Sequence, residues 1–163
     1  LHPRVRRQRQ MCIRDRHIIR VDLICVVFLG GCIGTALRYA CSVIPDCGAF
    51  HIGTFAANMA ACFVYAALSA WLGGTRRTVG RAKEYVNRGC GMGMCGGLST
   101  MSTLALEEFT MLHDGKAMDC AAYCCTTFIV GCLLAYVGAH VGLRFAGTEH
   151  NDGDRHAMGK EAD

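Results

Sequence analysis

Charged residues and prolines are scarce in this chain. Of its 163 residues, 18% are charged and 2 are proline, whereas 52% are hydrophobic and the mean hydropathy is +0.27. A typical soluble domain carries about 25% charged residues. Here the charges are also concentrated outside long apolar runs. This segregation argues against a soluble globular core and predicts an integral membrane protein.

Paired cysteines are also lacking, although the chain has 12 cysteines. No two of them have the Cys-x-x-Cys spacing that is typical of zinc sites and thiol redox centres. Most lie within the apolar runs, where cysteine usually packs as a small hydrophobic residue. The sequence therefore argues against a membrane thiol oxidoreductase, and we predict that the protein is not an enzyme.

Four apolar runs are each long enough to cross a bilayer. A membrane-spanning helix needs about 20 mostly apolar residues to cross roughly 30 Å of hydrocarbon. The sequence supplies such runs at residues 23–43, 52–72, 89–112 and 117–142. We therefore predict an all-α integral membrane protein whose four transmembrane helices form one domain over residues 21–145.

A glycine pair and a hydroxyl cluster occur within the third apolar run. Residues 94–104 read Met-Cys-Gly-Gly-Leu-Ser-Thr-Met-Ser-Thr-Leu. Irregular backbone at membrane depth is tolerated mainly where it is buried in protein or lines a polar pathway, because an unpaired N–H or C=O in hydrocarbon costs several kcal/mol. The pair Gly96 and Gly97 therefore predicts a broken third helix beside a permeation pathway.

Other glycines are spaced for close helix packing. The Gly-x-x-x-Gly spacing is found at Gly30 and Gly34, at Gly138 and Gly142, and twice in succession at Gly89, Gly93 and Gly97. Small residues one turn apart let helix backbones approach in lipid, where van der Waals contact rather than the hydrophobic effect drives association. We expect a tightly packed bundle.

The two ends of the chain are polar. Residues 1–20 are rich in arginine, and their first part, up to Arg16, resembles translated vector sequence more than a native leader. Residues 146–163 carry both charge signs. We expect disordered tails at 1–20 and 146–163.

The loop charges predict the orientation in the membrane. The loop between the second and third runs is rich in basic residues, whereas the first loop has none and the third has only Lys116. By the positive-inside rule, the protein is a multi-pass protein of the inner (plasma) membrane with both termini in the cytoplasm. Arg38, near the outer end of the first run, opposes this weakly. The net charge of +4 reflects these flanks, so we expect the lipid bilayer and no nucleic acid as a partner.

Several polar side chains lie within the predicted spans. Asn58 is a carboxamide in the second run, where it must find a hydrogen-bond partner or face a polar path. Its two N–H donors suit an anion, whereas the structural alternative is a hydrogen bond between helices. Ser102 and Thr103 in the third run and Tyr123 in the fourth add hydroxyl groups. Each hydroxyl alone is usually satisfied by its own helix, but together they can form a track.

Three motifs occur in order along these runs. They read Gly30-Gly-Cys-Ile-Gly-Thr-Ala-Leu-Arg-Tyr39, Gly53-Thr-Phe-Ala-Ala-Asn58 and Gly93-Met-Cys-Gly-Gly-Leu-Ser-Thr-Met-Ser-Thr-Leu104, the last followed by Glu107. In this order and spacing they resemble the CrcB/Fluc fluoride channel family, over about residues 23–142. The resemblance implies a fluoride-specific ion channel subunit that lets fluoride leave the cytoplasm passively and so limits its toxicity.

The resemblance also implies an assembly and an ion. Two four-helix subunits would pair as an antiparallel dimer that forms two pores and holds a structural sodium ion at its centre. The backbone carbonyls of Gly96 and Ser99 would bind the sodium. The fluoride pathway would include Asn58, Met101, Ser102, Thr103, Leu104 and Tyr123, with Glu107 as the acidic residue of the third span and Arg38 within the first motif.

The physical requirements of fluoride agree with this pattern. Fluoride is small and strongly hydrated, so a pore must replace its water with several N–H and O–H donors without a fixed cation that would trap the ion. The predicted spans carry such donors and no central Lys or Arg. Oxygen ligands from an unwound backbone likewise suit a hard cation such as sodium.

Two features depart from the family pattern. Met101 and Leu104 stand where the family normally has phenylalanines, whose positive ring edges can face an anion. A methionine is polarizable and can replace a ring only in part. The loop charges are also lopsided, although a chain that inserts both ways needs a nearly even balance. We therefore expect one half of a heterodimer with a homologous chain, and a homodimer is the alternative.

A second class of membrane protein fits the span count. A small proton-coupled multidrug-type transporter is also a four-span dimer, but its exchange site needs a membrane-embedded carboxylate, usually in the first span. In this chain Asp22 lies at the edge of that span, and Glu107 and Glu108 lie late in the third. The sequence therefore favours the channel over the transporter.

Overall fold

The computed structural model describes residues 20–45, 50–75 and 80–160, and for 148–160 only the backbone. These residues form helices and turns and contain no β-strand. The predicted basic tail lies outside the described residues, apart from Arg20. Arg20 Nη1 donates a hydrogen bond of 2.6 Å to Glu84 Oε2, and this bond is the main reason that the pKa of Arg20 is raised.

Within the described residues, three helices are long and apolar enough to span a membrane. They are α2 (Val21–Ser42), α3 (Ile52–Gly74) and the first part of α7 (Ala117–Lys160), over Ala117–Gly147. All three agree with predicted runs because an uninterrupted apolar stretch of this length forms a helix in either a core or a bilayer. The described part of the chain is therefore an all-helical membrane protein.

The third predicted run is divided into shorter elements. Helix α4 (Arg81–Val86) precedes the run. The first half of the run consists of the π-helix η1 (Asn87–Cys95) and the single turn α5 (Gly96–Leu98), and its second half is α6 (Met101–His113). Between the two halves, Ser99 and Thr100 have extended backbone, with ψ angles of 150° and 119°. The glycine pair itself stays helical, and the interruption follows it, because Thr100 caps the start of α6.

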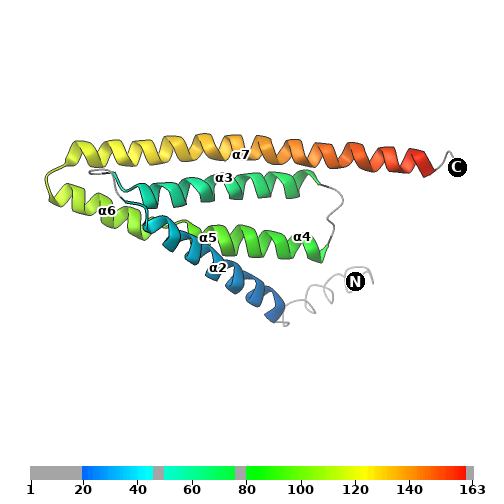
Figure 1. The fold of residues 1–163 in the computed structure, drawn as a ribbon, viewed down its shortest axis with the longest axis horizontal. Helices are drawn as coiled ribbons and strands as arrows, with labels where there is room; N and C mark the ends of the chain where they lie inside the picture. Colours follow the sequence, from blue (N-terminus) through cyan, green and yellow to red (C-terminus); the bar gives the residue numbers. More distant parts are fainter. Residues whose placement is uncertain (1–19, 46–49, 76–79, 161–163) are drawn as a thin grey trace, which may run out of the picture.

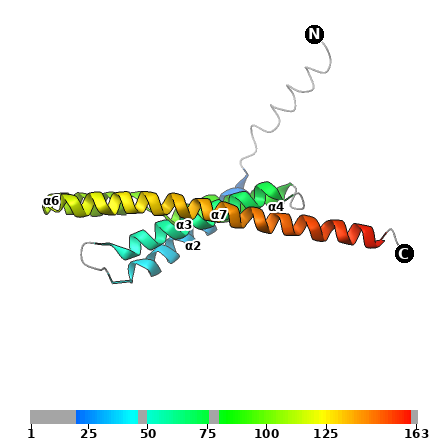
Figure 2. The ribbon, with the colours of Figure 1, turned by 90° about the horizontal axis from the view of Figure 1, so that it is seen from above.

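The four segments run alternately in opposite directions. Figures 1 and 2 show α3 beside α7 and α2 beside the segment that contains α4 and α5, with α6 leading to the α7 turn at one end. Gly115 makes that turn with a φ of 75°, which glycine adopts without strain. The elements α4, α5 and α6 run the same way as parts of one segment, and that segment runs opposite to α3 and α7.

Glycines make the closest helix contacts, as their spacing predicted. A Cβ atom at Gly30 or Gly34 of α2 would collide with backbone of Gly89 or Met94, and one at Gly142 of α7 would collide with the carbonyl of Ala67. Backbones pack this closely only where no side chain intervenes. The tight packing expected from the glycine spacing is confirmed at these positions.

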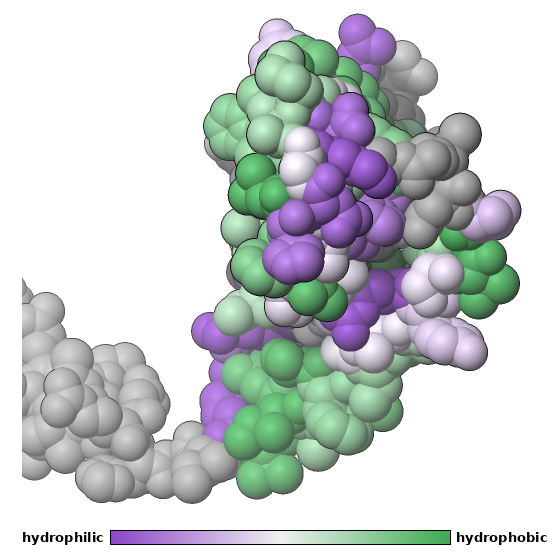
Figure 3. Space-filling model, turned by 90° about the vertical axis from the view of Figure 1, so that its left-hand side faces the viewer, coloured by the Kyte–Doolittle hydropathy of each residue, from purple (hydrophilic) through white to green (hydrophobic). Residues whose placement is uncertain are grey.

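The buried core is small, and much of the apolar surface is exposed. One cluster of buried residues consists of Ala57, Ala61, Cys95 and Leu98, and a second of Met111, Cys120 and Tyr123. Large apolar side chains on α2, α6 and α7 are exposed, as expected for surfaces that face lipid or another chain. Figure 3 looks onto the end where α6 meets α7, and hydrophilic residues gather there between hydrophobic ones.

Helix α7 is longer than the sequence pattern suggested. Its backbone remains helical to Lys160, whereas we expected a disordered tail over 146–163. Extending an existing helix adds one hydrogen bond for each residue fixed, and no proline stops it here. Residues 161–163 lie outside the described residues.

Candidate functional site

Asn58 closes the interruption in the third segment. Its Nδ2 donates to the Thr100 carbonyl at 3.2 Å, and its Oδ1 accepts from the Thr100 N–H at 2.8 Å. The carboxamide thus satisfies both backbone groups of a residue that has left the helix, where each unpaired group would be costly in an apolar environment. The sequence singled out both the amide and the irregular segment, and the structure brings them together.

The Thr100 hydroxyl organises a second set of contacts. Thr100 is buried, its Oγ1 accepts from the Thr103 N–H at 3.3 Å, and it lies 2.9 Å from Thr103 Oγ1 and 3.3 Å from Ser102 Oγ. This is the geometry of a helix N-cap, in which a hydroxyl replaces a missing intrahelical acceptor. Three hydroxyl groups therefore lie together at the start of α6. Thr100 was not among the predicted site residues, although its position at a helix start was a usable signal.

Two backbone carbonyls near the interruption have lost their usual helical partners. In an unbroken helix the Gly96 carbonyl would accept from the Thr100 N–H and the Ser99 carbonyl from the Thr103 N–H. Here the first N–H donates to Asn58 and the second to the Thr100 hydroxyl. Carbonyl oxygens without helical partners are suitable ligands for a hard cation. No cluster of His, Cys, Asp or Glu side chains suited to a metal occurs among the described residues.

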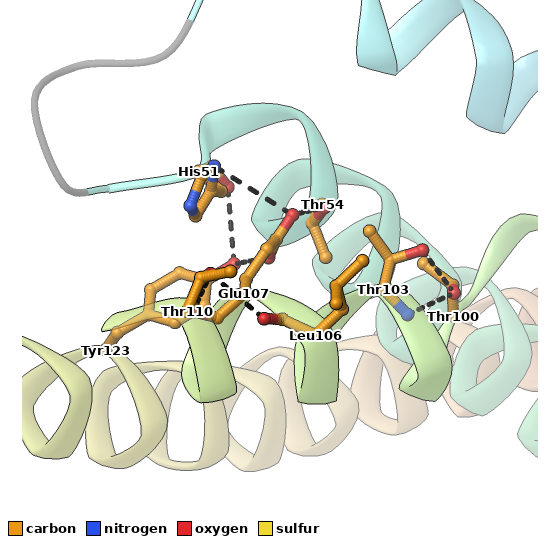
Figure 4. Close-up of polar contacts among 8 residues, drawn as sticks. All are labelled: His51, Thr54, Thr100, Thr103, Leu106, Glu107, Thr110 and Tyr123. Atoms are coloured by element: carbon orange, nitrogen blue, oxygen red, sulfur yellow. Dashed lines mark hydrogen bonds and ion pairs between the residues drawn. The ribbon is translucent and has the colours of Figure 1, made fainter. Parts of the chain in front are cut away.

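A second polar cluster surrounds Glu107 on α6. Thr54 donates its hydroxyl to Glu107 Oε1, and Tyr123 donates its hydroxyl to Glu107 Oε2 at 2.9 Å (Figure 4). Tyr123 is 1% exposed, and the Glu107 side chain is 12% exposed. His51 adds its Nδ1 at 4.0 Å from Glu107 Oε1. The carboxylate is thus held by groups from α3, α7 and the residue before α3.

Sequence reasoning missed two members of the Glu107 cluster. It named Glu107 and Tyr123 but neither Thr54 nor His51. Thr54 stands four residues before Asn58, so the two share one face of α3, and this spacing was an available signal. His51 precedes the helix, and its approach to Glu107 depends on the packing of α6, which no local pattern encodes.

A cavity of about 230 Å³ lies between the two clusters. Its lining includes Thr54 from the Glu107 cluster and Thr100 and Thr103 from the N-cap of α6. Arg38 of α2 is the only charged residue of the lining among the described residues. A cavity with several hydroxyl groups and one guanidinium offers hydrogen-bond donors to a small anion. The remaining lining residues are Thr35, Tyr39, Ser42 and Gly53.

The two residues at the family's phenylalanine positions have different surroundings. Met101 is 74% exposed, so in a single chain it faces outward. Leu104 packs inward against the cluster of Met111, Cys120 and Tyr123. The described structure therefore gathers Asn58, Ser102 and Thr103 around Thr100 and Leu104 near Tyr123, but it leaves Met101 apart.

Comparison with known proteins agrees with the motifs. Residues 25–139 match the family model described as CrcB-like protein, Camphor Resistance (CrcB). A protein of Bifidobacterium longum named fluoride-specific ion channel FluC 2 is 53% identical over 132 residues, which cover 81% of this chain and 74% of that protein.

Two more distant relatives carry similar names. A FluC 2 protein of Bacillus subtilis is 31% identical over 78% of this chain and 92% of its own length. A FluC 1 protein of Staphylococcus aureus strain NCTC 8325 is 32% identical over 71% of this chain and 93% of its own length. The matched region includes all three motifs and both polar clusters, and the chain belongs to the CrcB family.

Proposed function

We propose that this chain is a subunit of a fluoride-specific ion channel that lets fluoride leave the cytoplasm passively and so limits its toxicity. The observation that carries the proposal is the Asn58 carboxamide paired with the extended backbone at Thr100, in a chain whose relatives are named fluoride-specific ion channels. Such a channel binds and releases its ion without chemical change, so the protein is not an enzyme.

The proposed subunit crosses the plasma membrane four times. Three crossings correspond to α2, α3 and α7. The fourth is the divided segment from η1 to α6, which is too interrupted to count as one long helix but runs the length of its neighbours (Figure 1). By the positive-inside rule, the basic residues before this segment favour a cytoplasmic location for that end and for both termini.

The fluoride pathway follows the hydroxyl and amide groups of the two clusters. Asn58 and Thr103 supply donors near the interruption, and Tyr123 supplies one beside Glu107. Arg38 of α2 shares the cavity with Thr54 and Thr103, so a guanidinium also lies beside these donors. Ser102, Met101 and Leu104 complete the proposed pathway on α6, with Met101 and Leu104 offering apolar contacts in place of aromatic edges.

A structural sodium ion fits the carbonyls at the interruption. Gly96 and Ser99 would hold it, because the N–H groups that normally pair with their carbonyls donate elsewhere. Two carbonyls are fewer ligands than a hard cation needs, so the same atoms of a second subunit would complete the site. When bound, the sodium would fix the two interruptions against each other.

The functional unit is proposed to be an antiparallel dimer, and a heterodimer is favoured over a homodimer. The names FluC 1 and FluC 2 among the relatives indicate that some organisms carry two such chains. The lopsided loop charges favour a single orientation of this chain. A homologous partner of opposite charge bias would then insert the other way and supply the aromatic rings that Met101 and Leu104 do not.

Fluoride efflux from liposomes tests the proposal. Vesicles containing this chain, alone and with a co-purified homologue, should release fluoride when the electrical gradient is short-circuited. Asn58→Asp should abolish the flux, since a carboxylate repels an anion and has no N–H to donate. Asn87→Asp, on the exposed surface of η1, is the matched control and should conduct. Unchanged flux in Asn58→Asp would remove Asn58 from the mechanism.

The multidrug-type transporter is not supported by the relatives' names or by Asp22. That carboxylate lies in the first turn of α2 and accepts hydrogen bonds from Arg20 and Tyr85, so it is already paired at the end of the span. Proton-driven export of a cationic dye, without passive fluoride flux, would revive that alternative.

A further inference from the structure

His51 and Glu107 face each other across the second polar cluster. His51 Nδ1 lies 4.0 Å from Glu107 Oε1, and the two side chains are 30% and 12% exposed (Figure 4). Histidine is the side chain whose charge ordinarily changes between pH 5 and pH 8. When the imidazole is protonated, the two groups form an ion pair.

Glu107 competes with an anion for the same hydroxyl protons. An ionised carboxylate only accepts hydrogen bonds, and its two oxygens take the O–H groups of Thr54 and Tyr123. These are two of the donors that a passing anion would use. A negative charge in a site of low dielectric also repels an anion strongly. With a neutral His51 the cluster is therefore unfavourable to fluoride.

We propose that His51 is a positioning residue that sets the pH dependence of fluoride passage. Protonated His51 neutralises Glu107 and draws the carboxylate toward the imidazole, so that the hydroxyls of Thr54 and Tyr123 turn to the ion. The inference rests on the proposed function. It predicts that acid conditions accelerate fluoride passage.

The other groups near this pair do not change charge in the same pH range. Tyr123 of α7 faces His51 with ring centroids 6.3 Å apart, and Arg38 of α2 lines the cavity on the Thr54 side. A phenol and a guanidinium keep their protonation states between pH 5 and pH 8. Glu107 from α6 is the acidic partner. Asp46 of the preceding loop lies outside the described residues.

The test is the pH profile of fluoride efflux. Liposomes with the same pH inside and outside avoid any dependence on how the protein inserts, and protein-free vesicles provide the background leak of hydrogen fluoride. Between pH 7.5 and pH 5.5 the background-corrected rate should rise several-fold in the wild-type chain. In His51→Gln the ratio of the two rates should fall to about one.

Two further variants separate the electrostatic role from a structural one. His51→Arg carries a permanent charge, so its efflux should also lose the pH dependence but remain faster than that of His51→Gln at both pH values. His113→Gln is the matched control, because His113 ends α6 with its side chain 77% exposed beside Asp114. It should keep the wild-type ratio of the two rates.

The outcomes distinguish this inference from the proposed function. An absence of fluoride flux from every preparation, at any pH, would overturn the proposed function. Flux with the same pH profile in the wild-type chain and in His51→Gln, or a wild-type rate that falls in acid, would overturn the role of His51 alone.

Discussion

The two main helix contacts of this protein are built differently. Helix α7 packs on α3 through Gly138 and Gly142, which meet the backbone of α3 at Phe63 and Ala67. Helix α2 packs on the third segment through glycines on both sides, because Gly93 and Gly97 also meet the backbone of α2. In the first contact the glycines that meet the partner's backbone lie on α7 alone, and Gly74 of α3 meets only side chains, whereas in the second contact such glycines lie on both sides.

This difference accompanies a difference in helix regularity. Both α3 and α7 are unbroken α-helices, whereas the third segment contains a π-helix and an extended stretch. Each glycine in a helix costs about 1 kcal/mol relative to alanine, so a glycine-rich helix is more easily distorted. The polar groups of the proposed pathway gather beside the distorted segment. The regular pair thus supplies Thr54, Asn58 and Tyr123, and the distorted segment supplies Thr100 and Glu107, which they contact.

The largest expected effect comes from closing the space between α2 and the third segment. Gly34→Ala should destabilise the protein by about 3 kcal/mol, because its Cβ would collide with the backbone of Met94 and Leu98, which cannot rotate away. Thermal unfolding in detergent measures the loss. Gly31→Ala on the same helix is the control, since its Cβ would lie 4.0 Å from the nearest atom across the contact. Equal stability of the two variants would show that the contact is looser than described.

A smaller effect is expected at the hydroxyl cap of the interruption. Thr100→Val should lower the free energy of unfolding by about 1 kcal/mol, because α6 loses its N-cap while the backbone pairing with Asn58 remains. Unfolding measurements on Thr100→Ser should recover most of the loss, since serine restores the hydroxyl. A stability unchanged by valine would mean that the hydroxyl cluster contributes nothing to the interruption.

The smallest effect is expected at Gly96. This residue has helical dihedral angles, and a Cβ would meet no atom within 4 Å. Gly96→Ala should raise the unfolding free energy of the isolated chain by about 0.5 kcal/mol, because alanine favours the helical backbone and fits without a clash. The proposed dimer allows a second comparison. If a partner chain covers Gly96, the added Cβ should weaken dimerisation without destabilising the isolated chain. Sedimentation of both variants at several protein concentrations gives the dimerisation free energy.

Much of the fold followed from simple rules. The three uninterrupted spans and the close glycine contacts were predicted, because apolar length and small-residue spacing are local properties of the sequence. The interruption was expected at Gly96 and Gly97 but lies at Ser99 and Thr100. A helix ends where the next residue finds a better partner, and Thr100 finds one in Asn58, 42 residues away. That competition is a tertiary effect.

The site was only partly predictable for the same reason. Asn58, Ser102 and Thr103 were identifiable because polar groups in an apolar run need partners. Glu107 meets its partners only because α3, α6 and α7 pack together; the partners are Thr54, Tyr123 and His51. The outward position of Met101 depends on how α6 is rotated about its axis. The length of α7 was underestimated because a polar sequence can continue a helix that an apolar sequence has begun.

The carboxamide of Asn58 holds the interruption in place and keeps one N–H donor beyond those bonds. An amide nitrogen carries two hydrogens, and the hydrogen bond to the Thr100 carbonyl uses one of them. The same side chain can therefore stay bonded to the extended backbone at Thr100 while its second N–H donates to an ion in the proposed pathway. The Asn58–Thr100 hydrogen bonds need not break when an ion passes. The proposed transport would then require no conformational change in the subunit.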